Sequence, residues 1–102
     1  ALEGLSDLMA TLRSVKRKLN QTLDIFGVVL TMFDGRTNFS TQVAQEVRRH
    51  FPGKVFTTVI PRNVRLAEAP SHGLPVTAYE RSSRGAVAYR ELAQEVAAKL
   101  KR

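Results

Sequence analysis

Two short polar segments hold most of the residue types in this sequence that could bind a charged ligand. The first covers residues 31–38 (Thr-Met-Phe-Asp-Gly-Arg-Thr-Asn) and the second residues 60–65 (Ile-Pro-Arg-Asn-Val-Arg). Each follows an apolar run typical of a buried strand. If these strands are parallel neighbours, both segments leave the sheet at its carboxyl edge, where open α/β folds bind ligands. The pattern predicts one binding rim made of Met32, Asp34, Arg36, Pro61, Asn63 and Arg65. The alternative is that Asp34-Gly35 and Pro61 only form turns and that the arginines are solvated.

The sequence lacks the motifs that would give it chemistry of its own. It contains no Gly-x-x-x-x-Gly-Lys-Ser/Thr loop and no Gly-x-Gly-x-x-Gly, so no such row of backbone amides can cradle phosphates. A Gly-x-Ser-x-Gly elbow and a closely spaced carboxylate pair are also missing. His50 and His72 lie far apart, without a carboxylate at metal-ligand spacing. We therefore expect no catalytic residue and no metal ligand in this chain.

Helices that alternate with strands must position the two segments. Apolar residues at three- and four-residue steps predict a helix over residues 2–19. Nearly continuous apolar runs, typical of strands covered on both faces, predict strands over residues 25–33 and 55–60. A helix capped by Asn38 or Ser40 is expected between them, ending at His50 before Pro52-Gly53.

The remainder of the chain is expected to be mainly helical. One or two helical turns are predicted over residues 62–69 and a loop over residues 70–75. Ser82 or Ser83 would cap a final helix ending at Lys101. Its apolar face would consist of Val87, Leu92, Val96 and Leu100. The order helix, strand, helix, strand, short helix, helix predicts a single α/β domain over residues 1–102 with parallel strands.

Two strands are too few for a stable sheet. Because both runs look buried on both faces, each strand needs further neighbours. Either the missing strands precede Ala1, or another copy of the chain supplies the pairing.

The balance of charge favours a polyanionic partner. Sixteen Lys and Arg face nine Asp and Glu, for a net charge of +7, which predicts sequence-independent, salt-sensitive binding to DNA phosphates. The alternative is a solvated basic surface. Basic residues are concentrated in the second half, at Arg48, Arg49, Lys54, Arg62, Arg65, Arg81, Arg84 and Arg90. The absence of cysteine excludes a disulfide framework and a thiolate metal site.

At the two polar segments the sequence resembles the C-terminal portion of the ParA/Soj family of partitioning ATPases, which are deviant Walker-type P-loop proteins. The resemblance begins at Ala1-Leu2-Glu3-Gly4-Leu5 and covers essentially the whole chain. It is carried by residues 30–38, by residues 59–76 (Val-Ile-Pro-Arg-Asn-Val-Arg-Leu-Ala-Glu-Ala-Pro-Ser-His-Gly-Leu-Pro-Val), and by residues 83–86 with Ala88-Tyr89.

The resemblance implies a partial P-loop NTPase-like three-layer fold and a role in DNA segregation. Such proteins bind ATP with Mg, form homodimers around the nucleotide, bind double-stranded DNA without sequence preference, and respond to a ParB-type partner. They belong to the bacterial cytoplasm and the nucleoid, and not to a membrane. The family's adenine-side contacts match Thr31, Met32, Pro61 and Asn63, and its DNA-binding arginines match Arg36 and Arg65. We add Arg62, Arg81 and Arg84 from charge.

The phosphate loop of that family would lie before Ala1, so the chain is expected to bind no nucleotide tightly and to hydrolyse no ATP by itself. Two alternatives remain open. The chain could be a stand-alone basic DNA-binding module that uses no nucleotide. It could also be part of a metabolic α/β enzyme, for which the rim offers only Asp34 and Glu68 as catalytic side chains.

Overall fold

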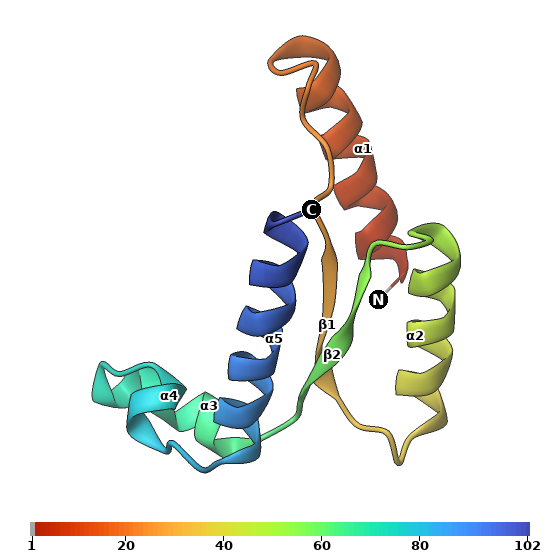
Figure 1. Ribbon diagram of the computed structural model, residues 1–102. Helices are drawn as coiled ribbons and strands as arrows, with labels where there is room; N and C mark the ends of the chain where they lie inside the picture. The colour runs from red at the N-terminus through yellow and green to blue at the C-terminus, as the bar shows by residue number, and fades with distance from the viewer. Residues whose placement is uncertain (1) are drawn as a thin grey trace.

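The computed structural model describes residues 2–102, so Ala1, where the resemblance begins, lies outside the described residues. Along the chain stand α1 (Leu2–Lys18), β1 (Val28–Phe33), α2 (Asn38–His50), β2 (Val55–Pro61), α3 (Val64–Glu68), the 3-10 helix η1 (Ala69–His72), α4 (Val76–Tyr79) and α5 (Arg84–Leu100). Figure 1 shows the two strands lying between α5 on one side and α2 on the other, with α1 extending beyond them.

The first helix follows the apolar spacing of its sequence. Leu5, Met9, Leu12 and Val15 are half-buried along α1. Leu8 and Leu19 also fit the apolar spacing of the predicted helix, but they are 62% and 82% exposed, and α1 ends at Lys18, before Leu19. Lys16, Arg17 and Lys18 occupy the last turn, where positive charge offsets the negative end of the helix dipole.

The sheet consists of β1 and β2 paired in parallel, which confirms the predicted α/β fold with parallel strands. Val28 pairs with Val55, Leu30 with Val59 and Phe33 with Pro61. Over the first interval β1 advances two residues while β2 advances four, so the pairing is irregular. Both strands end at the lower edge in Figure 1, where β1 leads to α2 and β2 leads to α3.

The expected start of the first strand at Ile25 is wrong, since β1 begins at Val28. Lysine ammonium groups donate hydrogen bonds to two backbone carbonyls just before β1. Lys54 Nζ donates to Ile25 O at 2.8 Å, and Lys99 Nζ donates to Phe26 O. These side-chain bonds replace ladder pairing just before β1.

Burial of both strands on both faces is also wrong. Among the strand residues only Ile60 is fully buried, at 1% exposure, whereas Thr31, Met32 and Thr57 are exposed. A strand is buried on both faces only when further strands flank it and helices cover both sides of the sheet. Within the described residues, this two-stranded sheet has neither the flanking strands nor the full helical cover.

The second helix begins as expected but uses a different cap. Thr37, with extended backbone at φ −103° and ψ 140°, accepts the Ser40 N–H on Oγ1 at 3.1 Å. An N-cap residue needs this non-helical conformation, and Asn38 already lies inside the helix. Ser40 is not the cap either, because its hydroxyl accepts the Asp34 N–H at 3.2 Å.

Short helices fill the segment between β2 and α5, where one short helix and a loop were expected. Asn63 caps α3, and η1 takes in residues 70–72 of the loop expected over residues 70–75, with Pro70 near its start and Gly73 at φ 65° after its end. Pro suits a helix start because its missing N–H needs no partner there. A further turn, α4, precedes the final helix.

The final helix is capped by Ser83, whose Oγ accepts the Ala86 N–H at 3.1 Å, as one of the two predicted caps. Its buried residues are Gly85, Ala86 and Ala88. The expected apolar face is wrong at Val87 and Leu100, which are 39% and 68% exposed. Small side chains let the preceding short helices approach α5 closely, and α5 also packs against β2.

A small core joins these elements. It consists of buried Ala69, Val76 and Ala86, with Leu66 and Tyr79 packed against it. A Cβ atom added at Gly85 would lie 2.6 Å from Leu66 Cγ, so α3 and α5 meet where only glycine fits.

Candidate ligand-binding rim at the carboxyl edge of the sheet

Two adjoining clefts open at the carboxyl ends of β1 and β2. We call them the first cleft, of about 630 Å³, and the second cleft, of about 510 Å³. Both are lined by Phe33, Asp34, Arg36 and Arg62. Because these four residues are shared, the clefts form one continuous surface, which we call the rim.

The polar centre of the rim is a bidentate ion pair. Arg36 Nε and Nη2 donate to Asp34 Oδ1 and Oδ2, each at 3.0 Å, and the Arg36 backbone N–H donates to Oδ1 at 3.1 Å. These hydrogen bonds from Arg36 lower the pKa of Asp34 to about 2. The Arg36 side chain remains 90% exposed, so it is oriented by Asp34 and still accessible to an anion.

Thr31 and Met32 line the first cleft from the end of β1. Met32 adopts φ 53°, in the left-handed region that non-glycine residues seldom occupy, and it is 64% exposed. It lies between the paired residues Leu30 and Phe33, where the register shifts. Backbone strain of this kind is often retained at ligand sites.

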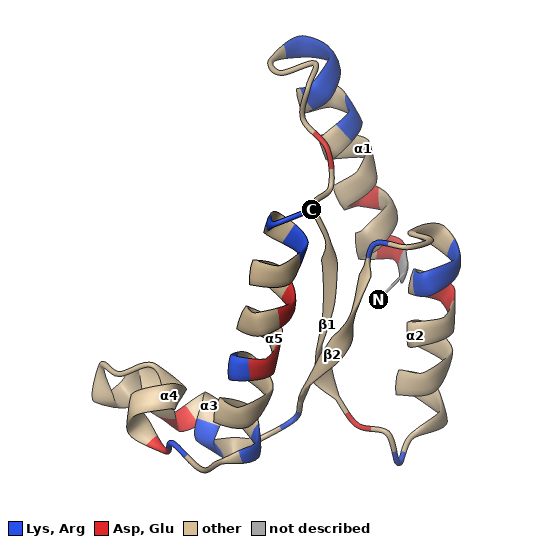
Figure 2. Ribbon diagram, in the orientation of Figure 1, with Lys and Arg blue, Asp and Glu red and all other residues tan. Residues whose placement is uncertain are grey.

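The second cleft combines the end of β2 with the start of α5. Pro61 and Arg62 line it together with Arg84, the first residue of α5. The Arg62 N–H donates to Phe33 O at 3.1 Å, which holds the two strand ends together. Figure 2 shows basic residues on the loop before α2, on the link from β2 to α3 and at the start of α5.

Seven of the residues predicted from sequence thus lie on the rim: Thr31, Met32, Asp34, Arg36, Pro61, Arg62 and Arg84. Three others line neither cleft. Asn63 is occupied as the cap of α3, where its Oδ1 accepts the Arg65 N–H at 3.2 Å. Arg65 is paired with Glu68 at 2.8 Å. Arg81 is exposed between α4 and α5.

Sequence reasoning missed the part of the wall of the first cleft that α2 supplies. Phe39, Ser40 and Val43 line it from α2, and Phe39 is 67% exposed. Their position just after the first polar segment is a signal that could have identified them. Because that helix starts at the rim, its first turn must adjoin the same cleft.

Two further properties of the described chain bear on function. Within residues 2–102, no three His, Cys, Asp or Glu residues lie close enough to hold a metal ion. In the same part of the chain, no helix has the length and apolar character needed to cross a membrane.

Comparison with known proteins shows the family. Residues 3–76 match the family described as the CobQ/CobB/MinD/ParA nucleotide binding domain. The chain is 59% identical over 98 residues to the sporulation initiation inhibitor protein Soj of Bacillus subtilis, covering 96% of this chain and 39% of that protein.

Two other relatives agree. The chromosome partitioning protein ParA of Caulobacter vibrioides is 55% identical over 96 residues, 94% of this chain and 36% of that protein. The chromosome-partitioning ATPase Soj of Thermus thermophilus is 53% identical over 100 residues, 98% of this chain and 40% of that protein. The chain therefore spans about two fifths of the length of these curated relatives. It belongs to the CobQ/CobB/MinD/ParA nucleotide-binding family, and its relatives are the Soj and ParA proteins that the sequence motifs indicated.

Proposed function

We propose that this chain is the C-terminal part of a ParA/Soj-type partitioning ATPase and that its rim supplies adenine-side and DNA-phosphate contacts for DNA segregation. The observation that carries the proposal is the placement of Thr31, Met32, Pro61 and three arginines on one surface at the carboxyl edge of a parallel sheet. Ligands of open α/β folds bind at this edge. The kinship with Soj and ParA proteins points to the same activity.

The nucleotide role rests on the first cleft and its neighbours. Thr31 and Met32 present exposed side chains there, beside the ring of Phe39, and such a mixed apolar and polar wall suits a purine base. Pro61, the last residue of β2, lines the second cleft, and Asn63 lies two residues later in the chain. The chain has no phosphate loop, so we propose that the phosphates and Mg are held by another part of the full-length protein.

The DNA role rests on exposed arginines. Arg36, Arg62 and Arg84 lie on the rim, and Arg65 and Arg81 lie on α3 and just before α5. Arginine on a surface contacts phosphates without reading bases, which gives affinity that does not depend on sequence. In the full-length protein this binding would act with homodimerisation, with a ParB-type partner and with a cytoplasmic, nucleoid-associated location.

Calorimetry with Mg-ATP tests the nucleotide role, using this chain, the full-length protein and full-length Met32→Ala. We expect binding only by the full-length proteins, with a weaker affinity for Met32→Ala. Lys18→Ala, at the far end of the molecule from the rim, is the matched control and should bind as the parent does. Tight binding by this chain alone would contradict the proposal, as would a Met32→Ala affinity equal to that of the parent.

The second candidate function is a basic DNA-binding module that uses no nucleotide, and the net charge of +7 favours it. The same calorimetry separates the two candidates. If the full-length protein binds DNA but shows no heat with Mg-ATP, this second function replaces the first.

A further inference from the structure

We propose that Glu68 restrains Arg65 from anionic ligands, that a DNA phosphate competes with this carboxylate for the guanidinium, and that Tyr79 retains the carboxylate after the exchange. The inference rests on the phosphate-contact role proposed above for Arg65. It adds a competing group inside the protein and a residue that holds the competitor after exchange.

The restraint is a direct ion pair on the surface of α3. Arg65 Nη1 donates to Glu68 Oε1 at 2.8 Å, three residues apart on the same helix. The two side chains are 46% and 38% exposed, so an incoming phosphate can reach the guanidinium. A guanidinium has five N–H donors, and Glu68 engages one of them while offsetting its charge.

Tyr79 holds the same carboxylate oxygen from another helix. Its hydroxyl donates to Glu68 Oε1 at 3.0 Å. The Tyr79 ring is half-buried, packs on the small core and stacks on His72 with ring centres 4.6 Å apart. This packing limits the movement of the hydroxyl, so Glu68 keeps a fixed donor when Arg65 leaves.

The charge states suit an exchange of this kind. Hydrogen bonds from Arg65 and Tyr79 lower the pKa of Glu68, so the carboxyl group is ionised at neutral pH. The hydrogen bond to Glu68 raises the pKa of Tyr79, so the hydroxyl keeps its proton and remains a donor. Phosphate and carboxylate then compete for one cation, and neither partner has to change its protonation state.

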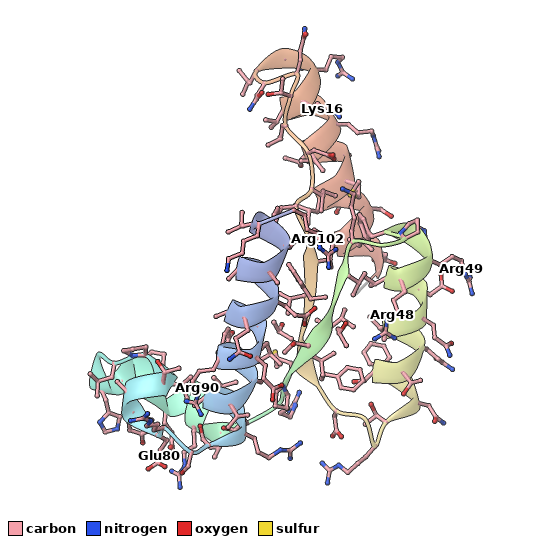
Figure 3. The ribbon with its side chains drawn as sticks, in the orientation of Figure 1. Lys16, Arg48, Arg49, Glu80, Arg90 and Arg102 are labelled. Atoms are coloured by element: carbon pink, nitrogen blue, oxygen red, sulfur yellow. The ribbon has the colours of Figure 1, made fainter. Side chains whose placement is uncertain are left out.

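The chain also contains a matched pair without the second donor. Arg49 Nη1 lies 2.7 Å from Glu46 Oε1, again three residues apart on one helix. In the structure of residues 2–102 the Glu46 carboxylate accepts no other side-chain hydrogen bond. Figure 3 places Arg49 near the end of α2 that points away from the rim. Glu46→Gln therefore makes the same change of charge without touching Arg65.

The test is a double-mutant cycle in the full-length protein, with fluorescence anisotropy on a non-specific DNA duplex at about 0.1 M salt. We expect Glu68→Gln to tighten binding about three- to fivefold, as loss of an exposed ion pair allows, and Glu46→Gln to change it less than twofold. In an Arg65→Ala background, Glu68→Gln should have no larger effect than Glu46→Gln. Equal effects of the two Gln variants, or an undiminished effect in the Arg65→Ala background, would overturn the restraint.

Tyr79→Phe tests the second part. Without the hydroxyl, the displaced carboxylate has only Arg65 as its donor, so DNA binding should weaken about two- to threefold. This loss should vanish in the Glu68→Gln background, whereas a general folding defect would persist there and would contradict the role of Tyr79. If Arg65→Ala itself leaves DNA affinity unchanged, the proposed phosphate contact of Arg65 fails and the restraint fails with it. If Arg65→Ala lowers the DNA affinity but Glu68→Gln does not raise it, the phosphate contact of Arg65 stands and only the restraint by Glu68 is refuted.

Discussion

Glu95 Oε1 accepts the backbone N–H of Thr58 at 2.6 Å, across a separation of 37 residues. Its second oxygen accepts the Thr57 N–H at 3.0 Å. The two amides lie between Val55 and Val59 of β2. This span of four residues pairs with an advance of only two residues along β1, from Val28 to Leu30. One carboxylate on α5 thus satisfies two amides in the irregular stretch and joins helix to strand.

Replacing Glu95 should weaken the joint between α5 and β2. We expect Glu95→Leu to lower the free energy of unfolding by about 1–2 kcal/mol, because two amides lose their acceptor. Glu95→Gln, which keeps one acceptor oxygen, should cost less. Urea unfolding of the chain gives both values, with exposed Glu91→Leu on the same helix as the control. Equal losses of unfolding free energy in Glu91→Leu and Glu95→Leu would show that the hydrogen bonds of Glu95 do not stabilise the fold.

The same contact predicts a loss of stability in acid. Hydrogen bonds from Thr58, with that of Thr57, lower the pKa of Glu95 below its usual 4.5. A carboxyl group with a lowered folded-state pKa stabilises the fold above its unfolded pKa and loses that contribution as the pH falls through the folded value. The difference in stability between the parent chain and Glu95→Gln should therefore shrink below pH 4.5.

The approach of α3 to α5 should not tolerate a methyl group at Gly85. A Cβ atom there would lie 2.6 Å from Leu66 Cγ and 2.9 Å from Cδ2. We expect Gly85→Ala to lower the free energy of unfolding by about 1–3 kcal/mol, the usual cost of overpacking. Gly4→Ala in α1 is the control, because its Cβ meets nothing within 4 Å and alanine favours a helix by about 0.5–1 kcal/mol. A stabilising Gly85→Ala would mean that Leu66 moves aside freely.

Asp34 should titrate well below an ordinary aspartate. Carboxyl carbon NMR shifts should give a pKa of about 2, because Arg36 donates three hydrogen bonds to this group. In Arg36→Ala the pKa should return toward 3.8. The ion pair contributes above pH 3.8 and is lost as the pH falls through 2, so the loop before α2 should loosen only in strong acid. An unchanged pKa in Arg36→Ala would assign the shift to another cause.

Arginines at the rim and on α3 should govern DNA affinity. In the full-length protein, Arg36→Ala and Arg65→Ala should each weaken binding across unrelated sequences and reduce the salt slope by about one unit, since each removes about one phosphate contact. Turnover of ATP without DNA should largely survive. Arg49→Ala is the control, because Arg49 also pairs with a glutamate three residues away on its own helix but lines neither cleft of the rim. A change in base preference would contradict a phosphate contact.

The amino-acid sequence by itself determined the local features of this protein. Helical spacing predicts α1, cap chemistry places the start of α5 after Ser82 or Ser83, of which the structure uses Ser83, and the apolar runs predict two strands in a parallel α/β fold. Helix periods and caps depend on residues within one or two turns, so they can be read without knowledge of the fold. The motifs of residues 30–38 and 59–76 likewise indicated the family that the comparison shows.

Tertiary structure alone decided how these elements meet. Lys54 and Lys99 donate hydrogen bonds to the backbone carbonyls just before β1, and Glu95 accepts a backbone N–H in the irregular part of β2. Of the predicted site, Arg36 lies on the rim, whereas Arg65 lies on α3, where it is paired with Glu68. Partners 29 to 73 residues apart become neighbours only when strands pair and helices pack on them, and no local pattern encodes which carboxylate or ammonium group will reach which backbone atom.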